Sequence, residues 1–308
     1  VAAADYRQEM TVSDEILKRV SDAYRRIRNT ARFLLGNLDG FKPDDALAPE
    51  QMLPFDRWAV DRALQMQDEI GRAYDDYQFM QVYQKVNNYC ALELSAVYLN
   101  VLKDRLYTTG RDSLPRRSAQ TAMYHIGEAL VRWIAPILSF TAEEVWENLP
   151  GERGASVLLA QWYEDLPTLP AGEAMGREYW QQVMAVRTAV NREMETQRAA
   201  GALRGSLDAR VNLYCSAELE AKLRALGDEL RFVLITSAAS LAPLAAAPEA
   251  AAMTDLPGLR LAVAVEDAEK CERCWHRRPE VGSIAAHPTL CERCVENIDG
   301  DGEQRRFA

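Results

Sequence analysis

The chain has 308 residues, a length that allows two or three domains at roughly 100 to 200 residues each, with a large hydrophobic core. Hydrophobic residues make up 48% and charged residues 27%, values typical of a globular protein and too apolar for a disordered chain. No apolar run reaches the roughly 18 residues that a membrane helix needs, so we expect a cytoplasmic protein without membrane contact. The formal net charge of −10 disfavours indiscriminate binding to a polyanion such as nucleic acid.

The first half of the chain has the hydrophobic periodicity of amphipathic helices. Five helices are predicted, at residues 13–39, 54–77, 79–107, 114–134 and 141–149. Thr141 and Glu144 form a capping-box signature, which places the start of the fifth helix at Thr141. The third helix is apolar on most of its circumference, and this pattern predicts a central position in a helical bundle.

The pattern changes after residue 150. Helices are predicted at 177–200 and 217–226, strands at 207–215, 232–235 and 259–265, and a loop at 242–252. The predicted fold is therefore mainly α with a small α+β part. We expect a helical bundle at 1–150, a connection at 151–175, a small α+β domain at 176–268 and a cysteine-rich knuckle at 269–308.

Four of the six cysteines form two Cys-x-x-Cys pairs near the end of the chain, at Cys271, Cys274, Cys291 and Cys294. The sixteen residues between the pairs lie within the range of four-cysteine zinc sites. Four thiolates leave no coordination position for water, so the spacing predicts one structural Zn²⁺. A redox-active pair, or His276 or His287 in place of one cysteine, are the alternatives. Cys90 and Cys215 are expected to be small buried hydrophobic residues.

Basic and aromatic residues stand between the cysteines. Trp275 is flanked by Arg273, His276 and Arg277, and a zinc knuckle is too small to bury an indole well. This combination favours a platform on which Trp275 stacks against an unpaired base, with Arg273 and Arg277 as RNA-contacting cations. The alternative is that Trp275 packs against the α+β domain.

Two helical segments are locally basic within the acidic chain. Residues 16–32 hold six cations and one anion, and Arg25, Arg28 and Arg32 recur at helical spacing on one face. Residues 103–117 hold five cations and two anions, and end with Arg116 and Arg117. Such edges suit the phosphates of a structured RNA. A solvated face with ion pairs inside the chain is the alternative.

No catalytic motif is found in the sequence. His125-Ile126-Gly127-Glu128 approaches the His-x-Gly-His signature of class I aminoacyl-tRNA synthetases, but lacks the second histidine and lies in a predicted helix. There is also no Lys-Met-Ser-Lys-Ser loop, Walker loop, Gly-x-Ser-x-Gly or His-Glu-x-x-His. His125 is therefore expected to pack in the bundle, and no catalytic residue is predicted.

Four stretches carry a family resemblance. They are SDEILKRVSDAYRRIRNTARFLLGNL (13–38), RRSAQTAMYHIGEALVRWIAPILSFTAEEVW (116–146), LGDELRFVLITS (226–237) and the segment 271–308, which holds both CERC motifs. Over essentially its whole length the chain resembles the C-terminal portion of bacterial isoleucyl-tRNA synthetases.

The resemblance implies an anticodon-binding bundle in residues 1–150 and zinc ligation by the four paired cysteines. It also implies that the partner is a tRNA that accepts isoleucine, and that ATP and Mg²⁺ belong to a catalytic domain outside this sequence. We expect a monomer that does not activate isoleucine by itself. The rival interpretation is a module that orients the parent enzyme and has little RNA affinity of its own. A free-standing zinc redox or chaperone protein is a third.

Overall fold

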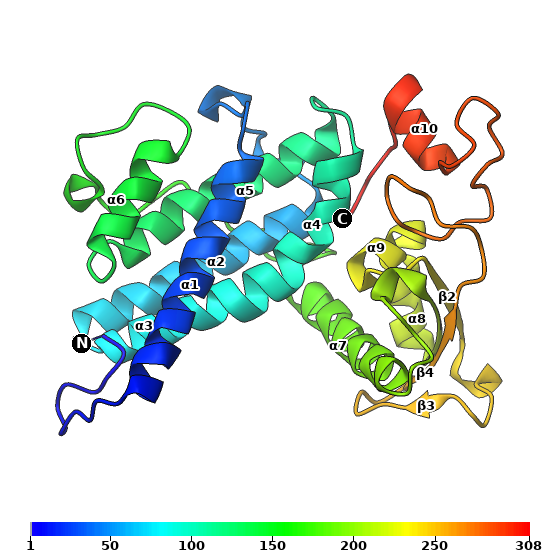
Figure 1. The fold of residues 1–308 in the computed structure, drawn as a ribbon, viewed down its shortest axis with the longest axis horizontal. Coiled ribbons are helices and arrows are strands. Elements are labelled where there is room, and N and C mark those ends of the chain that lie inside the picture. The colour runs from blue at the N-terminus through cyan, green and yellow to red at the C-terminus, as the bar shows by residue number, and fades with distance from the viewer. Residues whose placement is uncertain (1) are drawn as a thin grey trace. The chain divides into compact units, whose positions relative to one another are not determined.

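The computed structural model describes residues 2–308 and groups them into two compact units (Figure 1). Unit 1 contains the residues up to Met52 together with Asp56–Leu102 and Arg117–Leu169. Unit 2 contains Leu53–Phe55, Lys103–Arg116 and Pro170–Ala308. Each unit is thus assembled from stretches that are far apart in sequence. The sequence-based division at residues 150, 175 and 268 stays a prediction.

The first half of the chain is helical, as predicted. Its helices are α1 (Asp14–Asn37), α2 (Pro54–Asp75), α3 (Phe79–Asn88), the π-helix η3 (Tyr89–Tyr98), α4 (Leu99–Thr108), α5 (Leu114–Ile134) and α6 (Ser139–Asn148). Short 3₁₀ turns lie at η1 (Pro43–Asp45), η2 (Pro49–Gln51) and η4 (Val157–Leu159). The mainly α fold class is therefore confirmed.

A side-chain cap explains where α1 begins, whereas the start of α6 differs from the prediction. The Ser13 hydroxyl accepts a hydrogen bond from the Ile16 amide at 3.2 Å, which satisfies one of the free N–H groups at the start of α1. The capping box at Thr141 is wrong, because α6 already begins at Ser139 and Thr141 lies in its first turn. The Thr141 hydroxyl instead pairs with the Tyr24 hydroxyl of α1 at 3.2 Å.

The predicted third helix forms as α3, η3 and α4 in direct succession, with wider π-helical turns in the middle. Thr30 of α1 lies against this wider part, where its hydroxyl pairs with Ser95 at 3.1 Å. The core of unit 1 is aromatic as well as aliphatic. The fully buried ring of Trp133 lies 5.6 Å from Tyr89, and its Nε1–H donates to Gln67.

Unit 2 contains a four-stranded mixed sheet in the order β2-β1-β4-β3. The strands are β1 (Ala209–Cys215), β2 (Ala238–Pro243), β3 (Ala252–Met253) and β4 (Leu259–Val265). Strand β1 runs parallel to β2 and antiparallel to β4, and Leu213 is paired with Leu261. The helices are α7 (Arg177–Ala199), α8 (Ala217–Arg224), α9 (Leu230–Leu234) and α10 (Glu292–Asp299), with 3₁₀ turns η5 (Ser206–Asp208), η6 (Gly227–Glu229) and η7 (Leu244–Ala246).

Two predictions in this region are wrong. The strand expected at 232–235 is absent: residues 232–234 belong to α9, whose five residues are all buried, and Ile235 is the C-cap of that helix. A short apolar run without polar alternation does not distinguish a buried helix from a buried strand. The loop expected at 242–252 begins inside β2, which has an Ala-rich sequence with few of the β-branched residues that mark strands.

Candidate metal centre and nucleic-acid interface

The four paired cysteines come together at one point of unit 2. Cys271 and Cys274 lie in the loop after β4, Cys291 is the N-cap residue of α10, and Cys294 lies in the first turn of that helix. All four are buried, and their sulfur atoms lie within 4.8 Å of one another. The Sγ atoms of Cys274 and Cys291 are 3.7 Å apart, close to the ~3.8 Å expected of two thiolates on a tetrahedral zinc with Zn–S bonds of ~2.3 Å.

This arrangement fits one structural zinc ion. The two pairs converge on one point rather than lying apart as separate thiol pairs, which favours metal binding over the redox-pair alternative. His276 is not available as a substitute ligand, because its Nδ1 pairs with Arg231 at 3.2 Å and its Nε2 lies 3.5 Å from an Asp104 oxygen. The Nε2 of His287 is 2.7 Å from Asp299. A closed four-sulfur set holds the fold together and leaves no position for a reacting water.

The two remaining cysteines behave as packed hydrophobic groups. Burial raises the pKa of the Cys90 thiol to about 12 and that of Cys215 to about 11. A thiol with a raised pKa stays protonated near neutral pH, so neither cysteine has the thiolate character of a nucleophile. The sequence-based interpretation of both is confirmed.

Trp275 follows directly after the zinc ligand Cys274 and is 61% exposed. The alternative that it packs against the α+β domain is therefore wrong. Its backbone has a left-handed conformation, with φ of 67°, which a bulky L residue rarely adopts. The Trp275 amide donates to the Cys271 carbonyl at 2.9 Å, and the ammonium group of Lys270 lies 5.6 Å from the ring centre. The knuckle thus presents a large indole to solvent from a strained backbone position.

The arginines next to Trp275 are engaged inside unit 2. Arg273 donates from Nη1 to the Thr108 carbonyl at 2.6 Å. Arg277 donates from Nε to Asp208 at 2.8 Å and from Nη1 to the Ala268 carbonyl at 3.1 Å. Both side chains are partly buried. Their guanidinium groups hold the knuckle against the protein, which the residue pattern did not show.

A buried ionic cluster lies beside the knuckle. Asp104 receives hydrogen bonds from Arg293 and Arg305, and Glu303 contacts the same two arginines. The Arg305 guanidinium also lies 3.4 Å from the centre of the Phe232 ring. Burial opposes ionisation of Asp104, but the charge of Arg293 and the hydrogen bond from His276 outweigh it and hold the pKa of that carboxyl well below its usual range.

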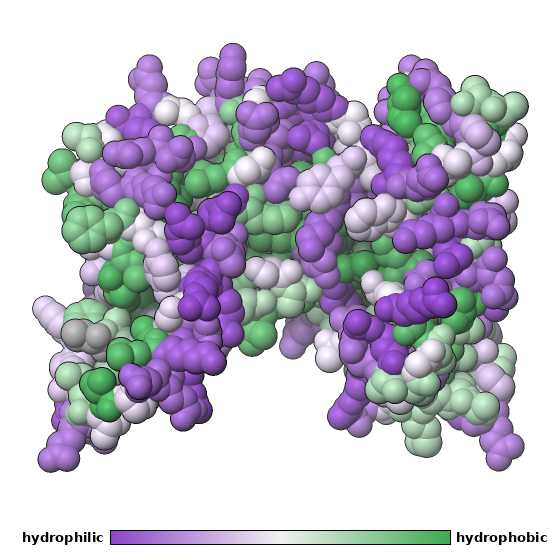
Figure 2. Space-filling model, in the orientation of Figure 1, coloured by the Kyte–Doolittle hydropathy of each residue, from purple (hydrophilic) through white to green (hydrophobic). Residues whose placement is uncertain are grey.

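The basic face of α1 belongs to unit 1. Arg25 is exposed and pairs with Asp22 at 2.9 Å, and Arg28 lies 3.5 Å from Glu144. Among residues 2–308, no acidic side chain lies within ion-pair distance of Lys18, Arg26 or Arg32. Figure 2 shows a mostly hydrophilic surface along α1. The alternative, a solvated face whose cations pair with acidic residues of the chain, fits Arg25 and Arg28. It does not fit Arg32, which is exposed and has no such pair among residues 2–308.

The second basic segment is largely engaged with the protein. Arg116 donates from Nη1 to the Leu106 carbonyl. Arg117 donates to Gln120 at 3.1 Å and lies 3.9 Å from Asp45, with only 18% of its side chain exposed. The Arg116 contact spans the turn between α4 and α5, whereas the Arg117 contacts link α5 to itself and to η1.

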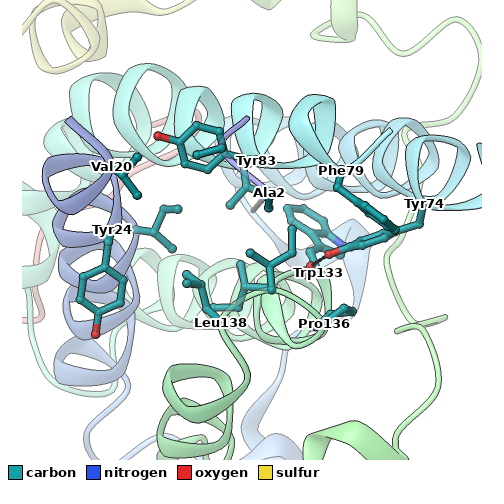
Figure 3. A pocket seen from close by; sticks show the side chains of 14 residues that line it. Ala2, Val20, Tyr24, Tyr74, Phe79, Tyr83, Trp133, Pro136 and Leu138 are labelled. Atoms are coloured by element: carbon teal, nitrogen blue, oxygen red, sulfur yellow. Dashed lines mark hydrogen bonds between the residues drawn. The ribbon is translucent and has the colours of Figure 1, made fainter. Parts of the chain in front are cut away.

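An apolar cavity of about 620 Å³ opens in unit 1 (Figure 3). Val20 and Tyr24 of α1, Tyr74 of α2, Phe79 of α3 and Trp133 of α5 line its wall. The Tyr74 hydroxyl donates to the Trp133 carbonyl at 2.7 Å. Within residues 2–308, none of the side chains that line the cavity is acidic, basic or a thiol, so this lining offers apolar contact.

His125 lies inside α5, as predicted, with its Nδ1 2.7 Å from the Tyr163 hydroxyl. Burial lowers the pKa of its imidazole, which favours the neutral form. No helix within residues 2–308 has the length and apolarity to cross a membrane.

Two family models and several known proteins match this chain. A family model described as the anticodon-binding domain of tRNA ligase matches residues 56–213, half of the chain. A second, described as a zinc finger found in FPG and IleRS, matches residues 268–297 and covers all four cysteines. The chain is 60% identical to the isoleucine–tRNA ligases of Pseudomonas paraeruginosa and Stutzerimonas stutzeri, and 59% identical to that of Azotobacter vinelandii. In each case the match covers 100% of this chain and 33% of the relative, so the chain spans about a third of their length.

Proposed function

The chain belongs to the anticodon-binding domain family of tRNA ligases, and we propose that it recognises the anticodon stem-loop of a tRNA that accepts isoleucine. The parent would be an isoleucine–tRNA ligase, which joins the amino acid to tRNA at the expense of ATP, with Mg²⁺, in a domain outside these residues. Isoleucine enters this proposal through the relatives, which are named isoleucine–tRNA ligases.

The exposed indole of Trp275 is the observation that carries the proposal. A side chain that buries little surface and occupies a costly backbone conformation does not stabilise the fold efficiently. The same features suit recognition, because an exposed ring held by a zinc knuckle can stack on an unpaired base without first being ordered. Stacking on one base is worth roughly 1–3 kcal/mol.

The phosphates of the stem require cations that are free to reach them. We propose Arg25, Arg28 and Arg32 of α1 as these contacts, with Arg32 the strongest because no ion pair competes for it. Arg116, Arg117, Arg273 and Arg277 already donate to protein groups. For these four we propose that any RNA contact uses their remaining N–H groups, secondary to their role in shaping the surface.

The second candidate function is an orienting module with little RNA affinity of its own. The internal hydrogen bonds of those four arginines favour it, because they show basic residues engaged in the fold. A monomer is proposed for either function. The cofactor is the same in both, one structural zinc held by the four cysteines.

Footprinting distinguishes the two candidates. The 308-residue chain is mixed with isoleucine tRNA and with the same tRNA carrying an altered anticodon loop, at one fixed salt concentration. We expect protection of the anticodon stem-loop that weakens when the loop is changed. Protection that ignores the loop sequence, or no protection, would favour the orienting module. In a parallel pyrophosphate-exchange assay we expect no isoleucine-dependent turnover by this chain.

A further inference from the structure

The two Cys-x-x-Cys pairs are the same tetrapeptide, Cys-Glu-Arg-Cys, at residues 271–274 and 291–294. Zinc ligation accounts for the cysteines and their spacing but not for the arginine at the third position of each pair. Arg273 and Arg293 therefore need another explanation.

Both arginines reach the last turn of α4. Arg273 donates to the Thr108 carbonyl at 2.6 Å. Arg293 donates two N–H groups to the two carboxylate oxygens of Asp104, each at 2.8 Å, and a third contact reaches the Thr108 hydroxyl at 3.3 Å. Thr108 is the last residue of α4, where the helix carbonyls lack helical partners and carry partial negative charge. Arg273 satisfies one of these carbonyls, and the positive charges of both arginines oppose the partial negative charge of the helix end.

Arg293 and Asp104 form a nearly buried, bidentate salt bridge. The exposed fractions of the two side chains are 12% and 14%. A planar guanidinium that meets both carboxylate oxygens fixes direction as well as distance, which a lysine at the same place would not do. Arg305, 1% exposed, also contacts Asp104, at an oxygen that Arg293 already contacts, and Glu303 offsets the additional positive charge. His276 lies 3.5 Å from the same carboxylate.

Trp275 is two residues beyond Arg273 and directly follows Cys274, so the contacts that fix these neighbours also fix the backbone that carries the indole. We propose that Arg273 and Arg293 are positioning residues for RNA recognition: they hold the zinc knuckle on the end of α4 so that Trp275 is presented in a single orientation. This inference rests on the proposed function. Arg293 acts through Trp275 and does not touch the RNA itself, and for Arg273 the positioning role comes before any RNA contact by its remaining N–H groups.

A double-mutant cycle tests the proposal in the 308-residue chain. Arg293→Gln removes the bidentate salt bridge from the side of the knuckle. Asp104→Asn removes it from the side of α4 and leaves the sequence of the knuckle unchanged. Arg278→Gln is the matched control, because Arg278 lies on the same knuckle but pairs with Glu280 at 2.9 Å. Zinc content is measured for every variant, and affinity is measured with isoleucine tRNA at one salt concentration.

We expect Arg293→Gln and Asp104→Asn each to weaken tRNA binding roughly tenfold, within the range for loss of one stacked base, with one zinc retained. In a Trp275→Ala background the same substitutions should produce no further loss. Additive losses would overturn the proposal, since they would mean that Arg293 contacts RNA itself. Unchanged affinity in both variants would overturn it as well.

Hydrogen exchange separates this proposal from the function on which it rests. In Arg293→Gln and Asp104→Asn, peptides that cover α4 and residues 269–299 should both exchange faster, while Arg278→Gln should not differ from the unmodified chain. Unchanged exchange would show that the arginines do not hold the knuckle. If the unmodified chain failed to bind tRNA, both the proposed function and the role of the arginines in recognition would be refuted. Hydrogen exchange would still show whether Arg273 and Arg293 hold the knuckle on the end of α4.

Discussion

Replacement of Trp275 by glycine, compared with replacement by alanine, separates its role in binding from its cost to the fold. The residue has a φ of 67° and keeps 61% of its surface in solvent. A left-handed backbone costs an L residue roughly 1–2 kcal/mol, and glycine does not incur this cost. Alanine retains the Cβ and therefore the strain.

The expected stability changes follow from the buried area. An aromatic side chain of ~200 Å² that is 61% exposed buries ~80 Å², worth at most ~2 kcal/mol at ~25 cal/mol per Å². Trp275→Ala should therefore lower the free energy of unfolding by up to ~2 kcal/mol, and Trp275→Gly by ~1 kcal/mol less than that. Both should weaken tRNA binding by about 1–3 kcal/mol, or roughly 5- to 150-fold.

Denaturant unfolding and tRNA titration at fixed salt measure the two effects, with zinc content as the check on the knuckle. Trp275→Phe is the matched control, because it keeps an aromatic face and should retain most of the affinity. If the Trp275→Ala variant bound tRNA as tightly as the unmodified chain, stacking by Trp275 would be refuted. A glycine variant less stable than the alanine variant would refute the strain argument.

Three further predictions address the rest of the molecule. Arg32→Gln should reduce the slope of log K against log salt by about 1, whereas Arg198→Gln, which removes an exposed cation paired with Glu195, should leave the slope unchanged; equal slopes for all three proteins would exclude Arg32 as a phosphate contact. Chelation of zinc should unfold residues 269–308, seen as rapid hydrogen exchange there, and protection that survives zinc loss would contradict a structural ion. Glu128→Gln should lower the free energy of unfolding at pH 7 by roughly 3 kcal/mol. Burial opposes ionisation of Glu128, but Arg153 and Arg132 lower the pKa of its carboxyl, so this contribution is complete above the ordinary Glu pKa and lost as the pH falls through the lowered value. Unfolding curves between pH 7 and pH 3 should therefore converge, and a difference that is constant with pH would contradict the pairing.

Local signals were sufficient for much of the fold. The predicted fourth helix has the same bounds as α5, because Pro115 suits a first turn and Pro136 prevents continuation. The four zinc ligands were readable because metal chemistry requires close, regular spacing. Both features depend on residues near one another in the chain.

Features that depend on residues far apart in the chain could not be predicted from the sequence. Asp104 and Arg293 are 189 positions apart, and nothing in either neighbourhood indicates the other. Strand β2 is defined by pairing with β1 more than by its own Ala-rich sequence. The exposure of Trp275 could not be predicted from the sequence either, because the same residue pattern is compatible with a packed indole.

The assembly of unit 2 from separate stretches limits how the protein can be divided by truncation or gene fusion. A product that began at residue 176 would keep all four cysteines but lose Phe55, whose ring lies 4.9 Å from the buried Trp180 and whose amide donates to the Phe307 carbonyl. It would also lose Asp104, and leave two nearly buried arginines without that partner. The knuckle is compact in sequence but not autonomous in structure, so exchange of this module between proteins would have to include the end of α4.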